Sequence, residues 1–135
     1  MILLDTSAIY ALADRADPNH TRAQSLFQQA IDNREVLLVH SYILAEAAAL
    51  LQHRLGLSIA LRFLREATAF QSHWITSQDH REAAELLARR GKRGLDLVDC
   101  TSFVVMRRSG VEEAFAFDAD FLREGFRLYG GEPPP

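Results

Sequence analysis

Short aliphatic runs that alternate with longer segments of helical periodicity constrain the fold of this chain more than any other feature. Residues 2–4 and 36–39 are unbroken apolar runs, which are typical of parallel strands buried on both faces. Weaker patterns predict strands at residues 73–77 and 114–117, and an edge strand at 126–129. The alternation of strands with amphipathic helices predicts an α/β fold, with a mostly parallel sheet of about five strands flanked by helices.

Polar residues suited to an N-cap precede each expected helix, where a side-chain oxygen accepts a backbone N–H. The expected start signals are Thr6 or Ser7, Asp17 before Pro18, Ser41, Ser58, Ser77 and Asp96. Gly56, Gly91 and Gly110 follow helical segments, and glycine readily adopts the left-handed conformation that ends a helix. These signals leave no segment that resembles an interdomain linker.

The length and composition fit one globular domain. The chain has 135 residues, of which 48% are hydrophobic and 24% charged, as is ordinary for a domain with one core. We expect the domain to span residues 1–129 and the segment GGEPPP, residues 130–135, to be a disordered tail. No apolar run reaches the roughly 18 residues of a membrane-spanning helix, so no membrane contact is expected. With no export signal and Cys100 as the one cysteine, the expected location is the cytoplasm.

Four acidic residues closely follow the predicted strands. Asp5 and Asp118 come directly after two of the strands. Glu46 and Asp99 lie in the opening turns of two predicted helices. Because strand ends and helix starts share one edge of a parallel sheet, all four carboxylates are expected at that edge, where ligand sites gather.

Each of these acids also has a structural explanation. Asp5 could cap the first helix, and Asp118 could open a turn. Asp99 stands three residues after the expected N-cap Asp96, so it could complete a capping box. Taken singly, these three acids favour the structural explanation. Glu46 differs, because no cation stands three or four positions away on the helix to offset its charge, so we expect it to face inward, with a solvated position as the alternative.

Together, four carboxylates at one edge require a positive partner. Ionised groups about 5 Å apart repel by about 3 kcal/mol per pair at an effective dielectric constant of about 20. Summed over all pairs, this repulsion exceeds the roughly 5–15 kcal/mol by which a domain is stable, so protons or a cation must be present. Oxygen ligands favour a hard divalent ion, Mg²⁺ or Mn²⁺. Such an ion suits phosphodiester hydrolysis, because it neutralises phosphate and lowers the pKa of its bound water.

The segments ILLDTSAIYAL, LAEAAALL, LDLVDCTSFVVMRR and AFAFDADF carry a family resemblance in their order and spacing. They resemble the PIN-domain nucleases and, within these, the VapC-type toxins of toxin–antitoxin pairs. The resemblance covers nearly the whole chain. It implies a three-layer PIN-like fold and an endoribonuclease that depends on Mg²⁺ or Mn²⁺ and is often dimeric. It also implies inhibition by a cognate antitoxin, a small DNA-binding protein whose tail enters the acidic site.

The acidic residues of the family match Asp5, Glu46, Asp99 and Asp118 by position. The resemblance implies that Asp5 and Asp99 are the principal metal ligands. It also implies that Asp118 binds or orients a second metal or its waters, and that Glu46 helps to position the attacking water. Ala116 is a departure, because the family commonly has Thr or Ser two residues before the fourth acid. The alternative is therefore a catalytically weak PIN-like module that acts by binding a protein or RNA partner.

RNA has to approach this acidic edge of a chain whose formal net charge is −3, so local cations are expected to guide its phosphates. The basic run Arg89, Arg90, Lys92 and Arg93, just before Asp96, is the best candidate for RNA binding. A solvated helix end, where arginine complements the helix dipole, explains the same run nearly as well.

The two helical segments between Ile43 and Phe70 carry more apolar surface than one core needs. Leu57, Ile59, Phe63 and Phe70 fall outside the main apolar stripe, so they could form a surface for a homodimer or for an antitoxin. Internal packing of these side chains is the alternative.

Overall fold

A parallel sheet in the order β3-β2-β1-β4-β5 forms the middle layer of the molecule. The structure, a computed structural model, describes residues 1–131. The strands are β1 (Ile2–Leu4), β2 (Leu37–His40), β3 (Gln71–His73), β4 (Glu113–Phe115) and β5 (Arg127–Leu128). All neighbouring strands are parallel, so their carboxyl ends share one edge of the sheet. The predicted α/β fold with a parallel sheet is confirmed.

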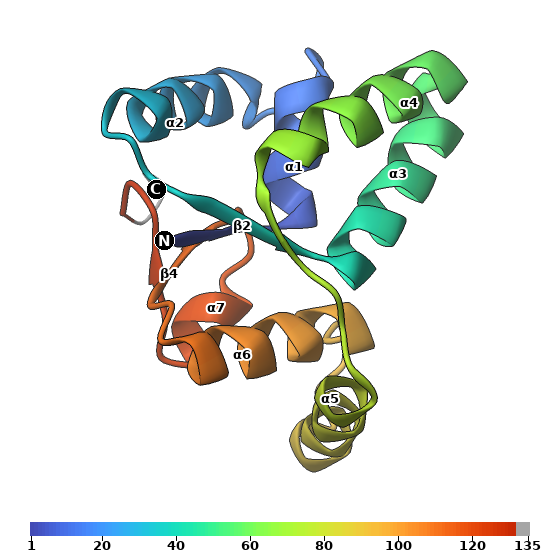
Figure 1. Cartoon of the computed structure of the whole chain (residues 1–135), viewed down its shortest axis with the longest axis vertical. Coiled ribbons are helices and arrows are strands. Elements are labelled where there is room, and N and C mark those ends of the chain that lie inside the picture. The colour runs from blue at the N-terminus through green and yellow to red at the C-terminus, as the bar shows by residue number, and fades with distance from the viewer. Residues whose placement is uncertain (132–135) are drawn as a thin grey trace.

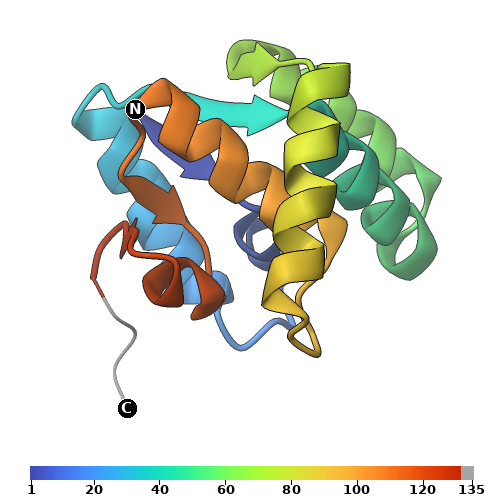
Figure 2. The same ribbon diagram turned by 90° about the horizontal axis from the view of Figure 1, so that it is seen from below.

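Helices cover both faces of the sheet (Figure 1). They are α1 (Thr6–Ala13), α2 (His20–Asp32), α3 (Ser41–Leu55), α4 (Leu57–Glu66), the short 3₁₀ helix η1 (Ala67–Ala69), α5 (Ser77–Arg90), α6 (Leu97–Ser109) and α7 (Asp120–Arg123). Helices α1 to α4 lie on one side of the sheet, and α5 to α7 lie on the other. Figure 2 shows α5 packed beside α6 on that second side. Within residues 1–131, no helix is long and apolar enough to cross a membrane.

The central strand β1 explains why both faces of the sheet need helices. Ile2–Leu4 are all buried, although successive side chains of a strand point to opposite faces. On the α6 side, the ring of Phe103 stacks on that of Phe126, with centroids 5.9 Å apart. Phe103 also meets Phe121 edge to face at 5.2 Å. These aromatic contacts hold α6, the helix that carries Asp99, against the sheet.

Strand β3 differs from the expectation. The sequence predicts a strand at residues 73–77, whereas β3 spans Gln71–His73 and Thr76 already caps α5. β3 is an edge strand, paired only with β2 among the described strands, and Gln71 and Ser72 are exposed. An exposed edge strand tolerates polar side chains, so the aliphatic pattern that identifies the inner strands is absent here.

The cap of α3 also differs. The sequence favours Ser41, but the N-cap is His40, whose backbone is extended and whose Nδ1 accepts the Ile43 N–H at 3.3 Å. The hydroxyl of Ser41 instead accepts the N–H of Ile75 at 2.9 Å, which ties the segment after β3 to the start of α3. An imidazole nitrogen can replace the usual cap oxygen because it is a hydrogen-bond acceptor when the ring is neutral.

Other helix starts shift by a few residues. Asp17 does not cap α2, which begins at His20. Instead, Oδ1 of Asp17 accepts the Asn19 N–H at 2.8 Å in the turn before the helix. Helix α4 begins at Leu57, one residue before the expected Ser58.

The structure describes the first two residues of the expected tail, Gly130 and Gly131. Gly130, expected in the disordered tail, accepts a hydrogen bond from Arg22 at 3.0 Å through its carbonyl. Its φ of +81°, and the side chain of Leu26 against its Cα, leave room only for glycine. Residues 132–135 of the expected tail lie outside the described residues.

Candidate active site

Asp5 follows β1 and caps α1, so the first turn of α1 fixes its carboxylate at the carboxyl edge of the sheet. Its Oδ2 accepts hydrogen bonds from the backbone N–H and the hydroxyl of Ser7, at 3.1 and 2.6 Å. The hydroxyl of Ser7 also accepts the Phe117 N–H at 2.9 Å. Ser7 thereby ties the end of β1 to the segment after β4 that leads to Asp118.

Asp99 lies in the first turn of α6 and forms a capping box with Asp96. The Asp99 N–H donates to Oδ1 of Asp96 at 2.9 Å, and Oδ2 of Asp99 accepts the Asp96 N–H at 3.1 Å. The structural explanation for Asp99 is therefore correct. It leaves Oδ1 of Asp99 without a hydrogen bond in the part of the chain that the structure describes.

Asp118 lies beside Asp99, although the two residues come from different segments. One carboxylate oxygen from each of Asp99, Asp118 and Asp120 lies within 4.8 Å of the other two. Asp118 also opens the expected turn, because its Oδ1 accepts the Asp120 N–H at 2.9 Å. The structure thus adds Asp120 to the acidic group.

Asp120 differs from the other acids because it has cations of its own. Its Oδ1 pairs with the ammonium of Lys92 and, at 2.6 Å, with Arg123. The hydrogen bond from Lys92 is the main cause of a lowered pKa for Asp120, and Arg123 adds to the effect. Within residues 1–131, none of the four acids predicted from the sequence forms such an ion pair.

Glu46 lies in the second turn of α3, close to Thr6 at the start of α1. Burial raises the pKa of Glu46, the nearby Thr6 hydroxyl opposes this shift, and the charge of Asp96 adds to it. The contact with Thr6 falls outside hydrogen-bonding geometry. Oγ1 of Thr6 is therefore a buried oxygen with no partner among the described residues.

The pKa values show that the four predicted acids share one electrostatic environment. Burial raises the pKa of Asp5 to about 6, local hydrogen bonds oppose the shift, and the charges of Asp118 and Glu46 add to it. Burial also raises the pKa of Asp99 to about 8, and the charges of Asp96 and Asp5 contribute. Each acid therefore lies within the electrostatic range of at least one of the others, as the parallel sheet predicts.

The chemistry of this group fits a hard divalent cation. Its donors are carboxylate oxygens and the unpartnered hydroxyl of Thr6, which are the ligands that Mg²⁺ and Mn²⁺ prefer. The raised pKa values mean that, in the metal-free protein, Asp99 keeps its proton near neutral pH and Asp5 keeps its proton to a higher pH than an ordinary aspartate, and a cation can replace these protons.

Thr6 and Ser7 are the site residues that sequence reasoning misses. The sequence suggests them only as N-caps, but Asp5 caps α1. Ser7 instead orients Asp5, and Thr6 lies beside Glu46. Their position directly after a buried strand that ends in an acid is the signal for this role, because side chains there share the edge with the acid.

Ion pairs occupy half of the basic run expected to bind RNA. Arg90 pairs with Glu124 at 2.7 Å, and Lys92 pairs with an acid of the site, as described above. Arg89 and Arg93 are exposed, and the described residues include no ion-pair partner for either. The loop between α5 and α6 therefore borders the acidic group through Lys92 and carries Arg93, while Arg89 lies in the last turn of α5.

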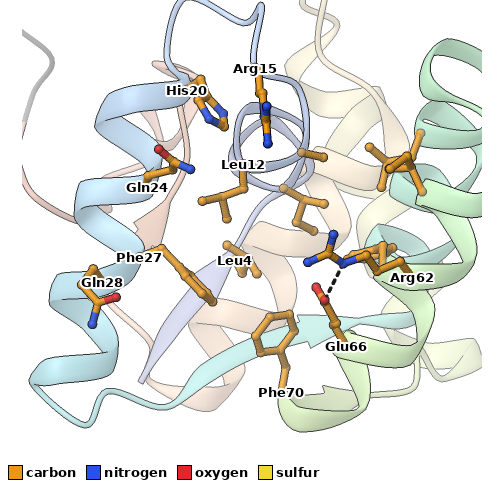
Figure 3. Close-up of a pocket in the computed structure, with 15 residues that line it drawn as sticks. Leu4, Leu12, Arg15, His20, Gln24, Phe27, Gln28, Arg62, Glu66 and Phe70 are labelled. Atoms are coloured by element: carbon orange, nitrogen blue, oxygen red, sulfur yellow. Dashed lines mark hydrogen bonds and ion pairs between the residues drawn. The ribbon is translucent and has the colours of Figure 1, made fainter.

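A groove of about 500 Å³ lies among α1, α2 and α4 (Figure 3). Aromatic side chains line it, namely those of Phe27, Phe63 and Phe70. Arg62 and Glu66 lie at its margin and form an ion pair at 2.8 Å. The groove is thus apolar inside and charged at its rim.

Helix α4 has two apolar faces. Ile59 and Phe63 line the groove, as does Phe70 after η1. Leu57 and Leu61 belong to another face and are 57% and 44% exposed. The alternative of internal packing holds in part, because Ile59, Phe63 and Phe70 pack against the core beside the groove, whereas Leu57 is exposed as the sequence suggests.

The sequence matches the family model of the PIN domain over residues 2–126. The chain is 34% identical over 128 residues to the 23S rRNA-specific endonuclease VapC20 of Mycobacterium tuberculosis, covering 93% of this chain and 95% of that protein. Ribonuclease VapC26 of the same organism is 26% identical over 109 residues, which cover 79% of this chain and 78% of that protein.

Two solved structures resemble this one. The crystal structure of Mycobacterium tuberculosis VapC20, described as a sarcin–ricin loop cleaving toxin, has a TM-score of 0.83 and 32% identity, covering 93% of this chain and 96% of that one. PAE2754 from Pyrobaculum aerophilum, with a TM-score of 0.66, 23% identity and coverage of 96% and 89%, shares the fold. The chain therefore belongs to the PIN-domain family, among the VapC-type ribonucleases.

Proposed function

We propose that this protein is a Mg²⁺- or Mn²⁺-dependent endoribonuclease and the toxin of a toxin–antitoxin pair. The observation that carries the proposal is the convergence of Asp5, Glu46, Asp99 and Asp118 at the carboxyl edge of the sheet. Relatives named as an endonuclease and a ribonuclease support the same reaction class.

Each acid has a role in this proposal. Asp5 and Asp99 are the principal ligands, each through the oxygen that the local cap leaves unused. Asp118 binds or orients a second ion or its waters. When bound, the divalent ion supplies positive charge for the RNA phosphate and lowers the pKa of water. Glu46 orients the attacking water, and burial raises its pKa, which makes it a stronger base than an ordinary glutamate.

Ala116 supports a second candidate function, a catalytically weak module that binds RNA or a protein. It is 6% exposed and lies two residues before Asp118, where related nucleases commonly carry Thr or Ser. Ala116 has no hydroxyl with which to orient Asp118. The Ser7 hydroxyl accepts the N–H of Phe117, the residue before Asp118, and so holds this segment in place.

Ribosomal RNA is the proposed substrate class. A relative that covers 93% of this chain is named as a 23S rRNA-specific endonuclease, and its crystal structure is described as that of a sarcin–ricin loop cleaving toxin. The sarcin–ricin loop is therefore the first RNA to test. Such a substrate and an antitoxin partner agree with action in the cytoplasm.

Two surfaces are proposed for protein partners. The aromatic groove of Figure 3 receives an apolar segment of the cognate antitoxin, whose tail then enters the acidic site. The exposed face of α4, with Leu57 and Leu61, is the proposed homodimer surface.

Cleavage of RNA in Mn²⁺ by wild-type protein and Asp5→Asn tests the catalytic proposal. We expect Asp5→Asn to lower kcat/KM by on the order of 100-fold or more, because it removes an anionic ligand. Asp32→Asn makes the same chemical change on the exposed surface of α2 and should retain full activity. Equal cleavage by Asp5→Asn and wild type would assign the activity to a contaminant and favour the binding module.

A further inference from the structure

His40 is a fully buried histidine between two helices that begin at the acidic site. It is the last residue of β2 and the N-cap of α3, the helix that carries Glu46. Its ring also contacts Ser102 of α6, the helix that carries Asp99. The metal-binding and water-positioning roles proposed above do not involve His40.

The hydrogen bonds of His40 define one tautomer. Nδ1 accepts the Ile43 N–H at 3.3 Å, so the proton of the neutral ring is on Nε2. Nε2–H donates to Oγ of Ser102 at 2.8 Å, and the Ser102 hydroxyl donates to the Val98 carbonyl at 3.2 Å. Burial, assisted by the charge of His73, lowers the pKa of His40 to about 3, so the neutral ring is the form present near pH 7.

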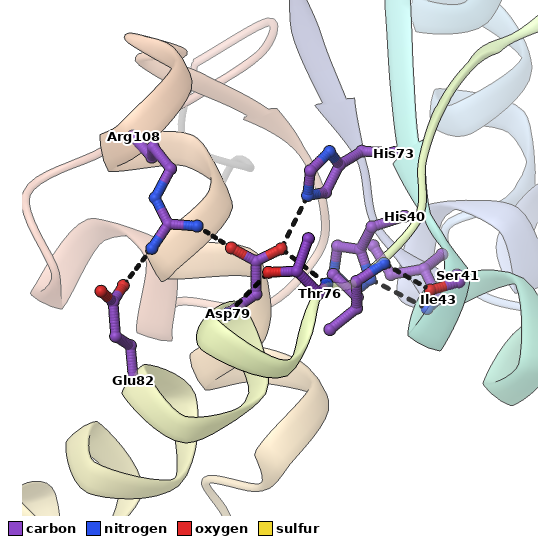
Figure 4. A network of polar contacts seen from close by, with 9 residues as sticks. His40, Ser41, Ile43, His73, Thr76, Asp79, Glu82 and Arg108 are labelled. Carbon is purple, nitrogen blue, oxygen red and sulfur yellow. Dashed lines mark hydrogen bonds and ion pairs between the residues drawn. The ribbon is translucent and has the colours of Figure 1, made fainter.

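The polar groups around His40 have partners of their own (Figure 4). The ring of His73 pairs with the buried carboxylate of Asp79 at 2.8 Å. Asp79 also accepts the Thr76 N–H at 3.0 Å and pairs with Arg108. This second network joins β3, α5 and α6 without using either ring nitrogen of His40, so the bonds of His40 to α3 and α6 are undisturbed.

We propose that His40 is a positioning residue that holds the first turns of α3 and α6 in register, so that Asp99 reaches the ion while Glu46 reaches the water beside it. The chain of hydrogen bonds ends at the Val98 carbonyl, which belongs to the peptide group between Val98 and Asp99. A change in the length of this chain therefore moves Asp99 relative to Glu46. The role rests on the proposed function, because it needs a divalent ion at the acidic site.

Calorimetric titration of the metal-free protein with Mn²⁺ tests this role without a measurement of cleavage. Ser102→Ala removes the hydroxyl that accepts from His40. His40→Asn keeps an N-cap oxygen for α3 but is too short to contact Ser102. Thr101→Val is the matched control, because the Thr101 hydroxyl is also buried in α6 and donates within that helix to the Leu97 carbonyl at 2.7 Å.

Mn²⁺ affinity is expected to fall about 10-fold in Ser102→Ala and His40→Asn, and to stay within about 2-fold of wild type in Thr101→Val. All three substitutions change a buried polar side chain, so a general loss of stability does not produce this difference. Equal affinities in all four proteins overturn the role of His40 alone. Wild-type protein that binds no Mn²⁺ overturns the proposed function, and this role with it.

The ring of His40 in the wild-type protein gives a second measurement that needs no substitution. Nitrogen NMR of the histidine rings near pH 7 is expected to show a neutral His40 ring with its proton on Nε2, exchanging slowly with water. A charged ring, or a proton on Nδ1, is incompatible with the chain of bonds from α3 to α6 and overturns the proposal.

Discussion

Asp5, Asp99 and Asp118 each divide their two oxygens between local structure and the candidate site. One oxygen of each accepts a hydrogen bond from a residue nearby in the chain, the partners being Ser7, Asp96 and Asp120 respectively. The other oxygen makes no hydrogen bond within the described chain, so it is available to a cation. The cap and turn roles of these acids therefore do not compete with a metal site. They fix the direction of each carboxylate before an ion arrives.

The raised pKa values predict the pH dependence of stability in the metal-free protein. The pKa rises from the ordinary value of 3.8 to about 6 for Asp5 and to about 8 for Asp99. Between about pH 4 and pH 8 these two acids bind more protons in the folded state than in the unfolded state, which outweighs the opposite effect of His40 below about pH 6.5, so the free energy of unfolding is lower at pH 8 than at pH 5. Scanning calorimetry in the presence of a chelator should give a lower thermal midpoint at pH 8 than at pH 5.

Asp99→Asn is the control for this pH dependence. An amide does not titrate, so this variant should lose most of the decrease between pH 6 and pH 8. Mn²⁺ should weaken the decrease in wild type, because the cation replaces the protons. Glu124, whose pKa the Arg90 and Arg107 hydrogen bonds lower from 4.5 to about 2, affects stability only at more acidic pH. Wild-type stability that rises between pH 5 and pH 8 contradicts the raised pKa values.

At the scale of elements, apolar patterns predict the parts of the fold that depend on burial. The inner strands β1, β2 and β4 can be recognised because both of their faces pack against helices. β3 cannot be placed in this way, because backbone pairing with β2 sets its position and its side chains are partly exposed. The N-cap of α3 cannot be predicted from the local sequence either, because His40 rather than Ser41 takes this position through a contact with Ser102 of α6.

In the candidate site, too, some residues can be predicted from the strand pattern and others cannot. The four predicted acids follow from the rule that parallel strands end at one edge of the sheet, because residues that come just after these strands are close in space although they are far apart in the sequence. Asp120 and Ser7 do not follow from it. Lys92, which pairs with Asp120, and Phe117, which donates to Ser7, lie in loops. The conformation of these loops determines whether the partners come within hydrogen-bonding distance.

Arg89, in the last turn of α5, and Arg93, in the loop that follows, are exposed and are predicted to contact RNA phosphates. Arg89→Ala and Arg93→Ala should each weaken RNA binding and reduce the slope of log K against log salt by about 0.7, the value for one phosphate contact on a single strand. Arg65→Ala, at an exposed position on α4, should leave the slope unchanged. Fluorescence anisotropy with RNA and the inactive Asp5→Asn protein, between about 50 and 200 mM salt, gives the slopes. Slopes that match Arg65→Ala in both Arg89→Ala and Arg93→Ala would leave solvation of the helix end as the explanation of the basic run.

At the scale of the whole molecule, α1 connects the acidic site to the aromatic groove. It begins at Asp5, and its residues Ile9 and Leu12 line the groove. With 8 residues, the helix is about 12 Å long. An extended peptide of about four residues spans that distance. An antitoxin segment bound in the groove can therefore reach the acids with a short tail, so one partner can occupy both places.

Phe63→Ala should separate inhibition from catalysis. Phe63 lines the groove, whereas Leu61, on the same helix, is 44% exposed on another face. Loss of the aromatic ring is expected to weaken the affinity for the cognate antitoxin about 30-fold or more, because buried aromatic anchors dominate such interfaces. RNA cleavage by the free protein should be unchanged.

Leu61→Ala should keep the antitoxin affinity and shift gel filtration towards the monomer. Calorimetry with the antitoxin checks both variants, and an antitoxin that binds Phe63→Ala as tightly as wild type excludes the groove as its main contact.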